Sequence, residues 1–180
     1  MKLFHVSEES DIKIFEPRKP VRKDMQSSPP LVWTLNEKCL PNFLTPRDCP
    51  RVTYHVISNT TKEDKQKYLS SHFSSHVVAI EQNWFERMKN TVLYIYEFDA
   101  ADFYLQDEIA GYYVSEKVQI PKSKIVITDL FAELFNRNVE LRLLPEIITL
   151  RDEIIKSSFA WSMCRMANAK KFIEKGEINL

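Results

Sequence analysis

One short segment, residues 46–51 with the sequence PRDCPR, gathers side chains that could do chemistry. Its two prolines stiffen a turn that carries Arg47 and Arg51 beside a carboxylate. Guanidinium groups offer paired donors that match phosphate or carboxylate oxygens, and a stiff loop loses little entropy on binding. The segment therefore predicts a phosphate site. The competing interpretation is a structural turn in which Asp48 caps backbone amides and pairs with an arginine.

Cys49 lies between the same two arginines, and nearby positive charge could lower the pKa of its thiol and make it a nucleophile. We find no histidine paired with it in sequence context, so a packed thiol is the competing interpretation. The other cysteines, Cys39 and Cys164, add no metal-ligand spacing. We expect all three thiols to be reduced.

The histidines give weaker signals. His5 lies in a strand-like segment, where one face would be buried and the other would open toward any cleft. A lone histidine in a strand is usually structural. His72 and His76 are four residues apart, a spacing that could share a metal on a helix, but the serines around them disfavour a regular helix. We therefore predict no metal site.

Three aromatic side chains, Trp33, Tyr112 and Tyr113, could stack on a planar ligand, although aromatic residues in short strands mostly fill cores. Glycine is scarce, because the chain contains only Gly111 and Gly176. The glycine-rich phosphate loops of P-loop and Rossmann proteins are therefore excluded in their usual form.

Composition narrows the class of partner. The 180 residues carry 25 basic and 25 acidic side chains, so the formal charge is zero. A general attraction to nucleic acid or to a membrane surface is not expected, although a local basic patch would be compatible with this balance. No signal-peptide pattern and no apolar stretch of about 20 residues occurs, which predicts a cytoplasmic protein. A protein partner is left unspecified.

The elements that must position these residues are mostly short. Alternating or β-branched segments predict strands, a polar segment at 59–75 predicts an exposed helix or a mobile lid, and two further helices are expected at 81–89 and 129–136. The expected strands or extended pieces are residues 2–6, 12–15, 31–35, 51–57, 92–98, 102–105, 111–115, 124–128 and 140–144.

A last, long helix is expected from Pro145, because Ile147, Leu150, Ile154 and Trp161 share a helical face. These elements predict an α+β fold, with a mixed, largely antiparallel sheet of short strands, flanking helices and a long C-terminal helix. We expect one domain over residues 1–169, followed by a polar tail over 170–180.

Several segments together resemble an uncharacterised bacterial domain family. They are residues 3–9 (LFHVSEE), 14–18 (IFEPR), 32–33 (VW) and 46–51 (PRDCPR), and the likeness spans most of the chain. The family brings no established activity with it. The resemblance therefore implies a lineage and not a reaction.

The order of elements is also distantly similar to the ADP-ribosyltransferase fold, whose sites use a histidine, an aromatic residue and often a glutamate from separate strands. That resemblance implies NAD as a substrate, with His5 on a ribose hydroxyl and Trp33 on the nicotinamide. It implies further that Arg47 and Arg51 meet the pyrophosphate. Residues 111–115 resemble the strand that carries the family's glutamate, which would bring Tyr112 and Tyr113 to the nucleotide.

The chain departs from that pattern at the glutamate, because Gly111 occupies the expected position. Glycine cannot stabilise the positive charge that develops as the glycosidic bond breaks. Glu108, or else Asp107, could substitute, and Glu108 is the candidate catalytic carboxylate. Equally, the site could bind a nucleotide or another phosphate ligand without reacting.

Three hypotheses remain open at this point: an ADP-ribosyltransferase-like enzyme that uses NAD, a non-catalytic domain that binds a phosphate ligand or a protein, and another enzyme class. The first requires His5, an aromatic residue, Arg47 or Arg51, and a carboxylate to line one cleft. The position of these side chains in the fold therefore discriminates between the hypotheses.

Overall fold

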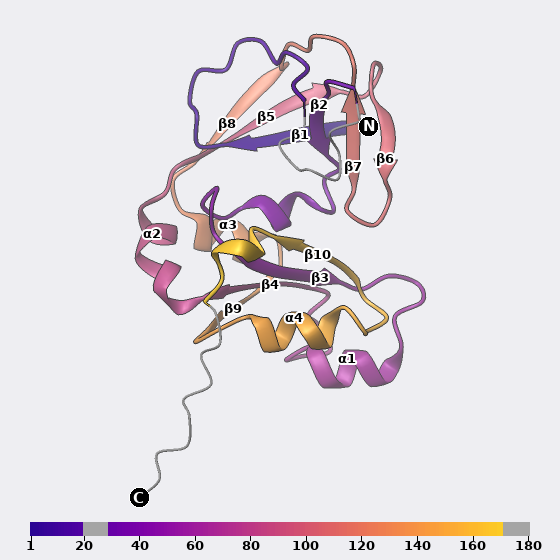
Figure 1. Ribbon diagram of the computed structural model, residues 1–180, viewed down its shortest axis with the longest axis vertical. Coiled ribbons are helices and arrows are strands. Elements are labelled where there is room, and N and C mark those ends of the chain that lie inside the picture. The colour runs from indigo at the N-terminus through magenta and orange to yellow at the C-terminus, as the bar shows by residue number, and fades with distance from the viewer. Residues whose placement is uncertain (20–28, 171–180) are drawn as a thin grey trace, which may run out of the picture.

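The computed structural model describes residues 1–19 and 29–170, and Figure 1 shows two β-sheets, one above the other, with helices between and below them. The larger sheet has the strand order β6-β7-β2-β1-β5-β8, and all its neighbours are antiparallel. Its strands are β1 (Lys2–Ser7), β2 (Val32–Leu35), β5 (Leu93–Asp99), β6 (Tyr104–Asp107), β7 (Tyr112–Ser115) and β8 (Ser123–Ile127).

The smaller sheet has the order β10-β3-β4-β9, in which only β4 and β9 run parallel. Its strands are β3 (Arg51–His55), β4 (His76–Glu81), β9 (Glu140–Leu144) and β10 (Ala160–Cys164). The α-helices are α1 (Lys62–Tyr68), α2 (Phe85–Asn90), α3 (Leu130–Asn136) and α4 (Ile148–Ile154), and the 3-10 helices are η2 (Leu40–Phe43), η3 (Gln82–Trp84) and η4 (Met166–Asn168). The expected α+β class with a largely antiparallel arrangement is confirmed, but as two sheets.

Strand alternation divides the interior into layers. On β5, Leu93 and Ile95 belong to the core between the two sheets, whereas Tyr96 and Phe98 belong to a second core on the outer face of the six-stranded sheet. Both faces of this strand are therefore covered. A third core lies beneath the four-stranded sheet, where α1 and α4 pack against it.

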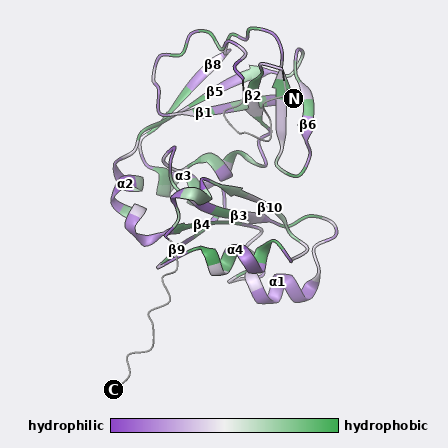
Figure 2. Ribbon diagram, viewed as in Figure 1, coloured by the Kyte–Doolittle hydropathy of each residue, from purple (hydrophilic) through white to green (hydrophobic). Residues whose placement is uncertain are grey.

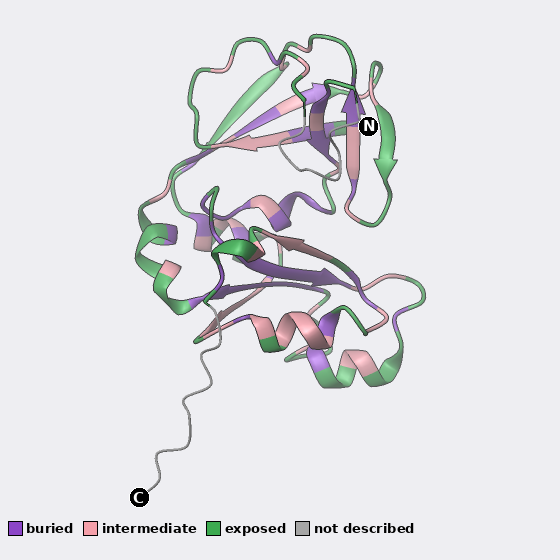
Figure 3. Cartoon of the chain, in the orientation of Figure 1, coloured by how far each residue is buried: buried purple, intermediate pink, exposed green. Residues whose placement is uncertain are grey.

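Burial differs sharply between central and edge strands. Figure 3 shows that β3 and β4 are buried along their whole length, whereas the edge strands β6 and β8 are largely exposed. The hydropathy colouring in Figure 2 shows a mainly hydrophilic α1, in keeping with its sequence KEDKQKY. Residues of α1 are nevertheless tied to the body of the protein, because Asp64 accepts hydrogen bonds from the main chain and hydroxyl of Ser158. These contacts favour the exposed-helix interpretation of this segment over a lid.

The expected long C-terminal helix is wrong. Helix α4 ends at Ile154, and the chain returns as β10, which pairs with β3. Two serines explain the break: the Ser157 hydroxyl donates to the carbonyl of Ile154, and Ser158 is held by Asp64. Serine side chains that bond to nearby backbone compete with helical hydrogen bonding. Trp161, expected on the helix, instead lies in a strand.

Two further expectations concern membrane spans and the C-terminal tail. Within the described residues, no helix is long and apolar enough to cross a membrane. The tail expected over 170–180 lies outside the described residues except for Lys170, whose main-chain N–H donates to Glu81. The extent of the domain stays a prediction.

Candidate functional site

His5 lies on the outer face of the six-stranded sheet, with its ring against Phe15 at 4.9 Å between centroids. Its Nδ1 lies 2.8 Å from the main-chain oxygen of Trp33. Because a carbonyl oxygen only accepts, Nδ1 carries the proton of the neutral ring and Nε2 keeps its lone pair. Burial lowers the pKa of His5, and Arg47 and Arg18 lower it further, against an upward contribution from the Trp33 hydrogen bond. His5 is therefore a neutral acceptor near neutral pH.

The two arginines beside His5 are exposed. The main-chain N–H of Arg47 donates to Glu8 at 2.8 Å, which attaches the PRDCPR turn to the chain just beyond the end of β1. Arg18 is held by two backbone hydrogen bonds to Leu31. Within the part of the chain that the structure describes, no carboxylate lies within ion-pair distance of either guanidinium group. Both positive charges can therefore meet an external anion.

Arg51 has a different environment, although it belongs to the same motif. It is buried between the sheets, where its Nε donates to the carbonyl of Asn42 at 2.6 Å and one Nη to the carbonyl of Cys49 at 3.0 Å. Its guanidinium carbon lies 4.9 Å from the ring centroid of Phe43. The structure thus places Arg51 in a structural position and separates it from Arg47.

The candidate aromatic residues are also divided. Trp33 and Tyr112 contact each other edge to face at 5.3 Å, and Tyr112 contacts Phe43 at 6.1 Å. Alternation along the strands puts these rings on the face opposite to His5. Tyr113 points to the outer face and packs there against the second core. His5 and Trp33 therefore meet through the Trp33 main chain and not across a common cleft.

Glu108 lies far along the sheet from Arg47. It is exposed in the turn between β6 and β7, at the end of β2 where Asn36 donates to the carbonyl of Gly111. β1 and β2 are antiparallel, so the Arg47 turn lies at the other end of this strand pair. Neither Glu108 nor Gly111 brings a carboxylate to His5.

Gly111 itself is required by the turn. Its φ is +68°, and a Cβ there would lie 2.6 Å from Cys39 Sγ and 2.7 Å from Asn36 Oδ1. L-residues with side chains rarely adopt this backbone conformation, and the space is already filled. A glutamate at this position would not fit the turn as built.

The reactive-thiol hypothesis for Cys49 is wrong. The side chain is fully buried, and burial raises the pKa of its thiol to about 12 despite the opposing charge of Arg51. The metal-sharing alternative for His72 and His76 also fails, because His76 is buried in β4 while His72 lies outside any helix. Within the described ranges, no group of three or more His, Cys, Asp or Glu side chains is arranged to hold a metal ion.

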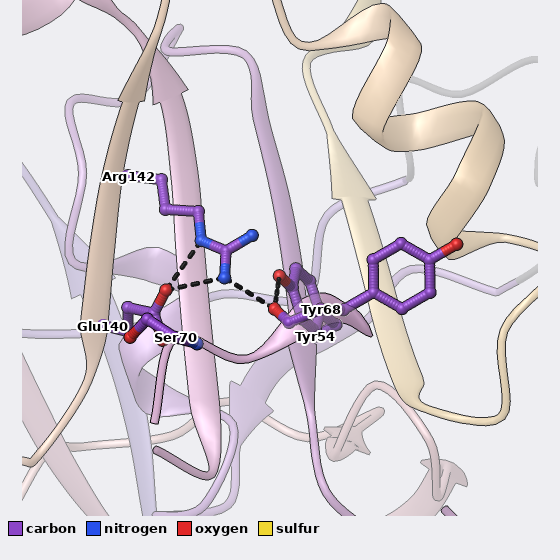
Figure 4. A network of polar contacts seen from close by, with 5 residues as sticks. All are labelled: Tyr54, Tyr68, Ser70, Glu140 and Arg142. Carbon is purple, nitrogen blue, oxygen red and sulfur yellow. Dashed lines mark hydrogen bonds and ion pairs between the residues drawn. The ribbon is translucent and has the colours of Figure 1, made fainter. Parts of the chain in front are cut away.

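A network of polar contacts links residues on the four-stranded sheet to the chain around Tyr68 and Ser70. Figure 4 shows Arg142 between Glu140 and Tyr68. The Nε of Arg142 donates to Glu140 at 2.7 Å, and one Nη donates to the carbonyl of Tyr68 at 2.6 Å. The Tyr54 hydroxyl donates to the same carbonyl, and the main chain of Ser70 donates to Glu140. Burial opposes ionisation of Glu140, but the hydrogen bonds from Ser70 and Arg142 lower its pKa overall. The charged members of this network are paired with each other, which indicates a structural role.

Sequence reasoning missed a pair of histidines, His55 and His76, which lie opposite each other on β3 and β4. The signal that could have found them is the apolar run of residues 77–80, which is typical of a fully buried strand. Pairing this strand with residues 51–55 in antiparallel register would have brought the two rings together.

The fold defines this chain as an α+β protein built from two sheets. The sequence model of a family described as "Family of unknown function (DUF6886)" matches residues 4–169, and the chain belongs to that family. No curated protein and no solved structure matches the chain. The resemblance to a domain family without an assigned activity is thus confirmed, while the likeness to ADP-ribosyltransferases stays a prediction.

Proposed function

We propose that this chain is a non-catalytic binding domain for a phosphate-bearing nucleotide, with NAD as the probe of choice, and that the ligand binds at the outer face around His5. The observation that carries the proposal is a neutral imidazole, fixed by the Trp33 carbonyl, under the electrostatic influence of two exposed arginines, Arg18 and Arg47, that have no carboxylate partners in the described chain. The ring and the two charges have complementary uses.

The lone pair on Nε2 of His5 can accept a hydrogen bond from a ribose hydroxyl, because Nδ1 is already committed as a donor. The guanidinium groups of Arg18 and Arg47 can donate paired hydrogen bonds to phosphate oxygens. A ligand that carries a hydroxyl and a phosphate close together uses both features at once. Ribose phosphates have this combination.

The same geometry argues against transfer chemistry. The Trp33 ring lies on the face opposite to His5, Glu108 is exposed in a turn at the other end of the β1–β2 pair, and the turn at Gly111 excludes a glutamate there. Binding without bond cleavage is therefore the function that these positions support best. An ADP-ribosyltransferase-like enzyme is the alternative.

Isothermal titration with NAD tests the proposal, with nicotinamide release assayed in the same mixtures. Arg47→Gln removes one charge-assisted contact at an exposed position, and we expect it to weaken binding about tenfold. His5→Asn keeps an N–H donor near the Trp33 carbonyl but removes Nε2, and we expect a similar loss. Arg151→Gln, on α4 beyond the four-stranded sheet, is the matched control and should bind like the natural chain.

The outcomes are distinct. Saturable binding that both site variants weaken, with no nicotinamide released, supports a binding domain. Release of nicotinamide that depends on His5 would replace the proposal with the enzyme alternative. Absence of NAD binding to the folded natural chain, or binding that Arg47→Gln leaves unchanged, would overturn the proposal.

A further inference from the structure

A cavity of about 310 Å³ lies on the side of the molecule where β3 and β4 meet α3 and the chain before η2. Its wall includes His55, His76, Lys38 and Arg137, with Glu37 at the same opening. Small-molecule sites occupy roughly 300–1,000 Å³, so this cavity is at the small end of that range. It lies apart from the His5 face and has no part in the function proposed above.

The two histidines in the cavity wall form a cross-strand pair. Their ring centroids are 5.2 Å apart and the planes are tilted by 31°. His76 Nε2 lies 2.7 Å from Oδ1 of Asn42, and the carbonyl of Asn42 accepts from Arg51. This second contact fixes Asn42, so His76 is held from behind by a rigid partner.

His55 lacks such a partner. Its side chain is only 4% exposed, and within the described residues its Nδ1 is buried with no hydrogen bond. A buried polar atom without a partner costs about 1–3 kcal/mol, and native proteins rarely leave one without a reason. Nδ1 is too enclosed for a bound group to touch, so a ligand in the cavity would meet the other ring nitrogen, Nε2, which is not enclosed in this way.

The charges around the pair select the chemistry of that group. Burial lowers the pKa of His55 to about 4, and Lys38 lowers it further. Burial likewise lowers the pKa of His76 to about 3, with His55 and Lys38 contributing in the same direction. Arg137 adds a second positive charge at the wall, partly offset by its ion pair with Glu133 at 2.7 Å.

A metal cation would be repelled by Lys38 and Arg137, and within the described residues no third His, Cys, Asp or Glu side chain is arranged with the two imidazoles to hold one. An oxyanion would instead be attracted by both cations and could accept the N–H of His55. The Ser75 and Lys38 residues at the wall provide further donors. The observations therefore favour a negatively charged oxygen ligand.

We propose that the His55–His76 cavity binds a small molecule through an oxyanion, a phosphate or carboxylate group, which accepts a hydrogen bond from Nε2 of His55 and forms an ion pair with Lys38. Inorganic phosphate and acetate are the two probes, and their relative affinities distinguish a phosphate-bearing from a carboxylate-bearing ligand. Binding needs no covalent step and no additional ion.

The test follows the imidazole nitrogens of the ¹⁵N-labelled protein by NMR at pH 7 while each probe is added. We expect the His55 and His76 signals to shift saturably with at least one probe. Lys38→Met is the decisive variant, since Lys38 is exposed and its removal should leave the fold intact. We expect it to weaken the better probe about tenfold.

Two controls separate this site from the His5 face. Arg47→Gln should leave the shifts of His55 and His76 unchanged, and His72→Ala, an exposed histidine outside the cavity, should do the same. His55→Phe should abolish the response of His76. If that variant does not fold, the Lys38→Met comparison decides alone.

Several results would overturn the inference. These are shifts confined to His5, shifts that Lys38→Met leaves at full affinity, and no response of His55 to either probe. Saturable binding of Zn²⁺ that requires His55, together with silence toward both oxyanions, would also overturn it in favour of a metal site. Failure of NAD binding at the His5 face would leave this inference standing.

Discussion

The two sheets differ in the burial of their charged side chains. In the six-stranded sheet, charged groups such as Lys117 and Asp102 lie at the exposed rim and pair with each other in solvent. In the four-stranded sheet, Arg51, His55 and His76 lie on strands that are buried throughout. A polar group at a rim can turn to water, whereas a buried one depends on a fixed protein partner.

Buried side-chain atoms without a hydrogen-bond partner lie in or next to the four-stranded sheet. Within the described residues, the buried side-chain atoms without a hydrogen bond are Thr45 Oγ1, His55 Nδ1 and Glu81 Oε2. Two of these residues belong to β3 and β4, and Thr45 precedes β3 in the connecting segment. The contribution of the four-stranded sheet to the stability of the protein should therefore depend on the protonation of these groups and on what binds to them.

Acidification should expose this difference most strongly. His55 and His76 have folded-state pKa values of about 4 and 3, below the ordinary value of 6.5. The unfolded chain therefore takes up protons first, so the stability from the neutral rings is complete above pH 6.5 and is lost as the pH falls toward 4 and 3. We expect a loss of about 1–2 kcal/mol per histidine between pH 6.5 and 4.5, after solvent screening.

Urea denaturation at a series of pH values measures this loss. His55→Asn should flatten the dependence of the free energy of unfolding on pH, while His72→Ala, at an exposed position, should leave its slope unchanged. If the free energy of unfolding of His55→Asn depends on pH as steeply as that of the natural chain, the proposed difference between the sheets is wrong.

In the six-stranded sheet, we expect the largest loss of stability from a change at Gly111, in the turn between β6 and β7. Gly111→Ala introduces a Cβ 2.6 Å from Cys39 Sγ at a φ of +68°. Overpacking and backbone strain each cost about 1–3 kcal/mol, so we expect destabilisation by about 2–3 kcal/mol. Urea denaturation checks this, and Ala110→Gly next to it should change stability by less than about 1 kcal/mol. A neutral Gly111→Ala would show that the turn can relax.

The smallest effect concerns a satisfied polar group in the four-stranded sheet. Tyr54→Phe removes the hydroxyl that donates to the carbonyl of Tyr68 at 2.7 Å, but Arg142 still donates to that carbonyl. We therefore expect a loss of only about 1 kcal/mol in thermal or urea unfolding. Tyr104→Phe, at an exposed edge strand, is the control and should be close to neutral. A loss as large as that at Gly111 would mean that the network acts as one unit.

The local sequence pattern predicted strands best where residues of different polarity alternate between the two faces of the strand. The segment at residues 92–98 was correctly predicted as a strand from its alternation, and the helix expected at 129–136 is found as α3. β4 escaped detection because its apolar residues do not alternate and a serine-rich stretch precedes them. The long helix failed because Ser157 and Ser158 bond to backbone and to Asp64, a tertiary contact that periodicity does not contain.

The candidate site was predicted less well, because a site depends on pairing between distant segments. Sequence identified His5 and Arg47, and in the fold the Arg47 charge contributes to lowering the pKa of His5. It could not show that Arg51 turns inward while Arg47 turns outward, since that follows from where β3 begins. Nor could it pair His55 with His76, which are joined only through the register of two strands.

Strands of the two sheets alternate along the sequence. The chain builds β1 and β2 in the larger sheet, β3 and β4 in the smaller one, β5 to β8 in the larger one, and β9 and β10 in the smaller one. No single cut releases either sheet whole. The four-stranded sheet cannot be complete before its last strand, residues 160–164, has been synthesised. Assembly thus rests on contacts between remote parts of the chain, and such topologies fold slowly, with both halves maturing together.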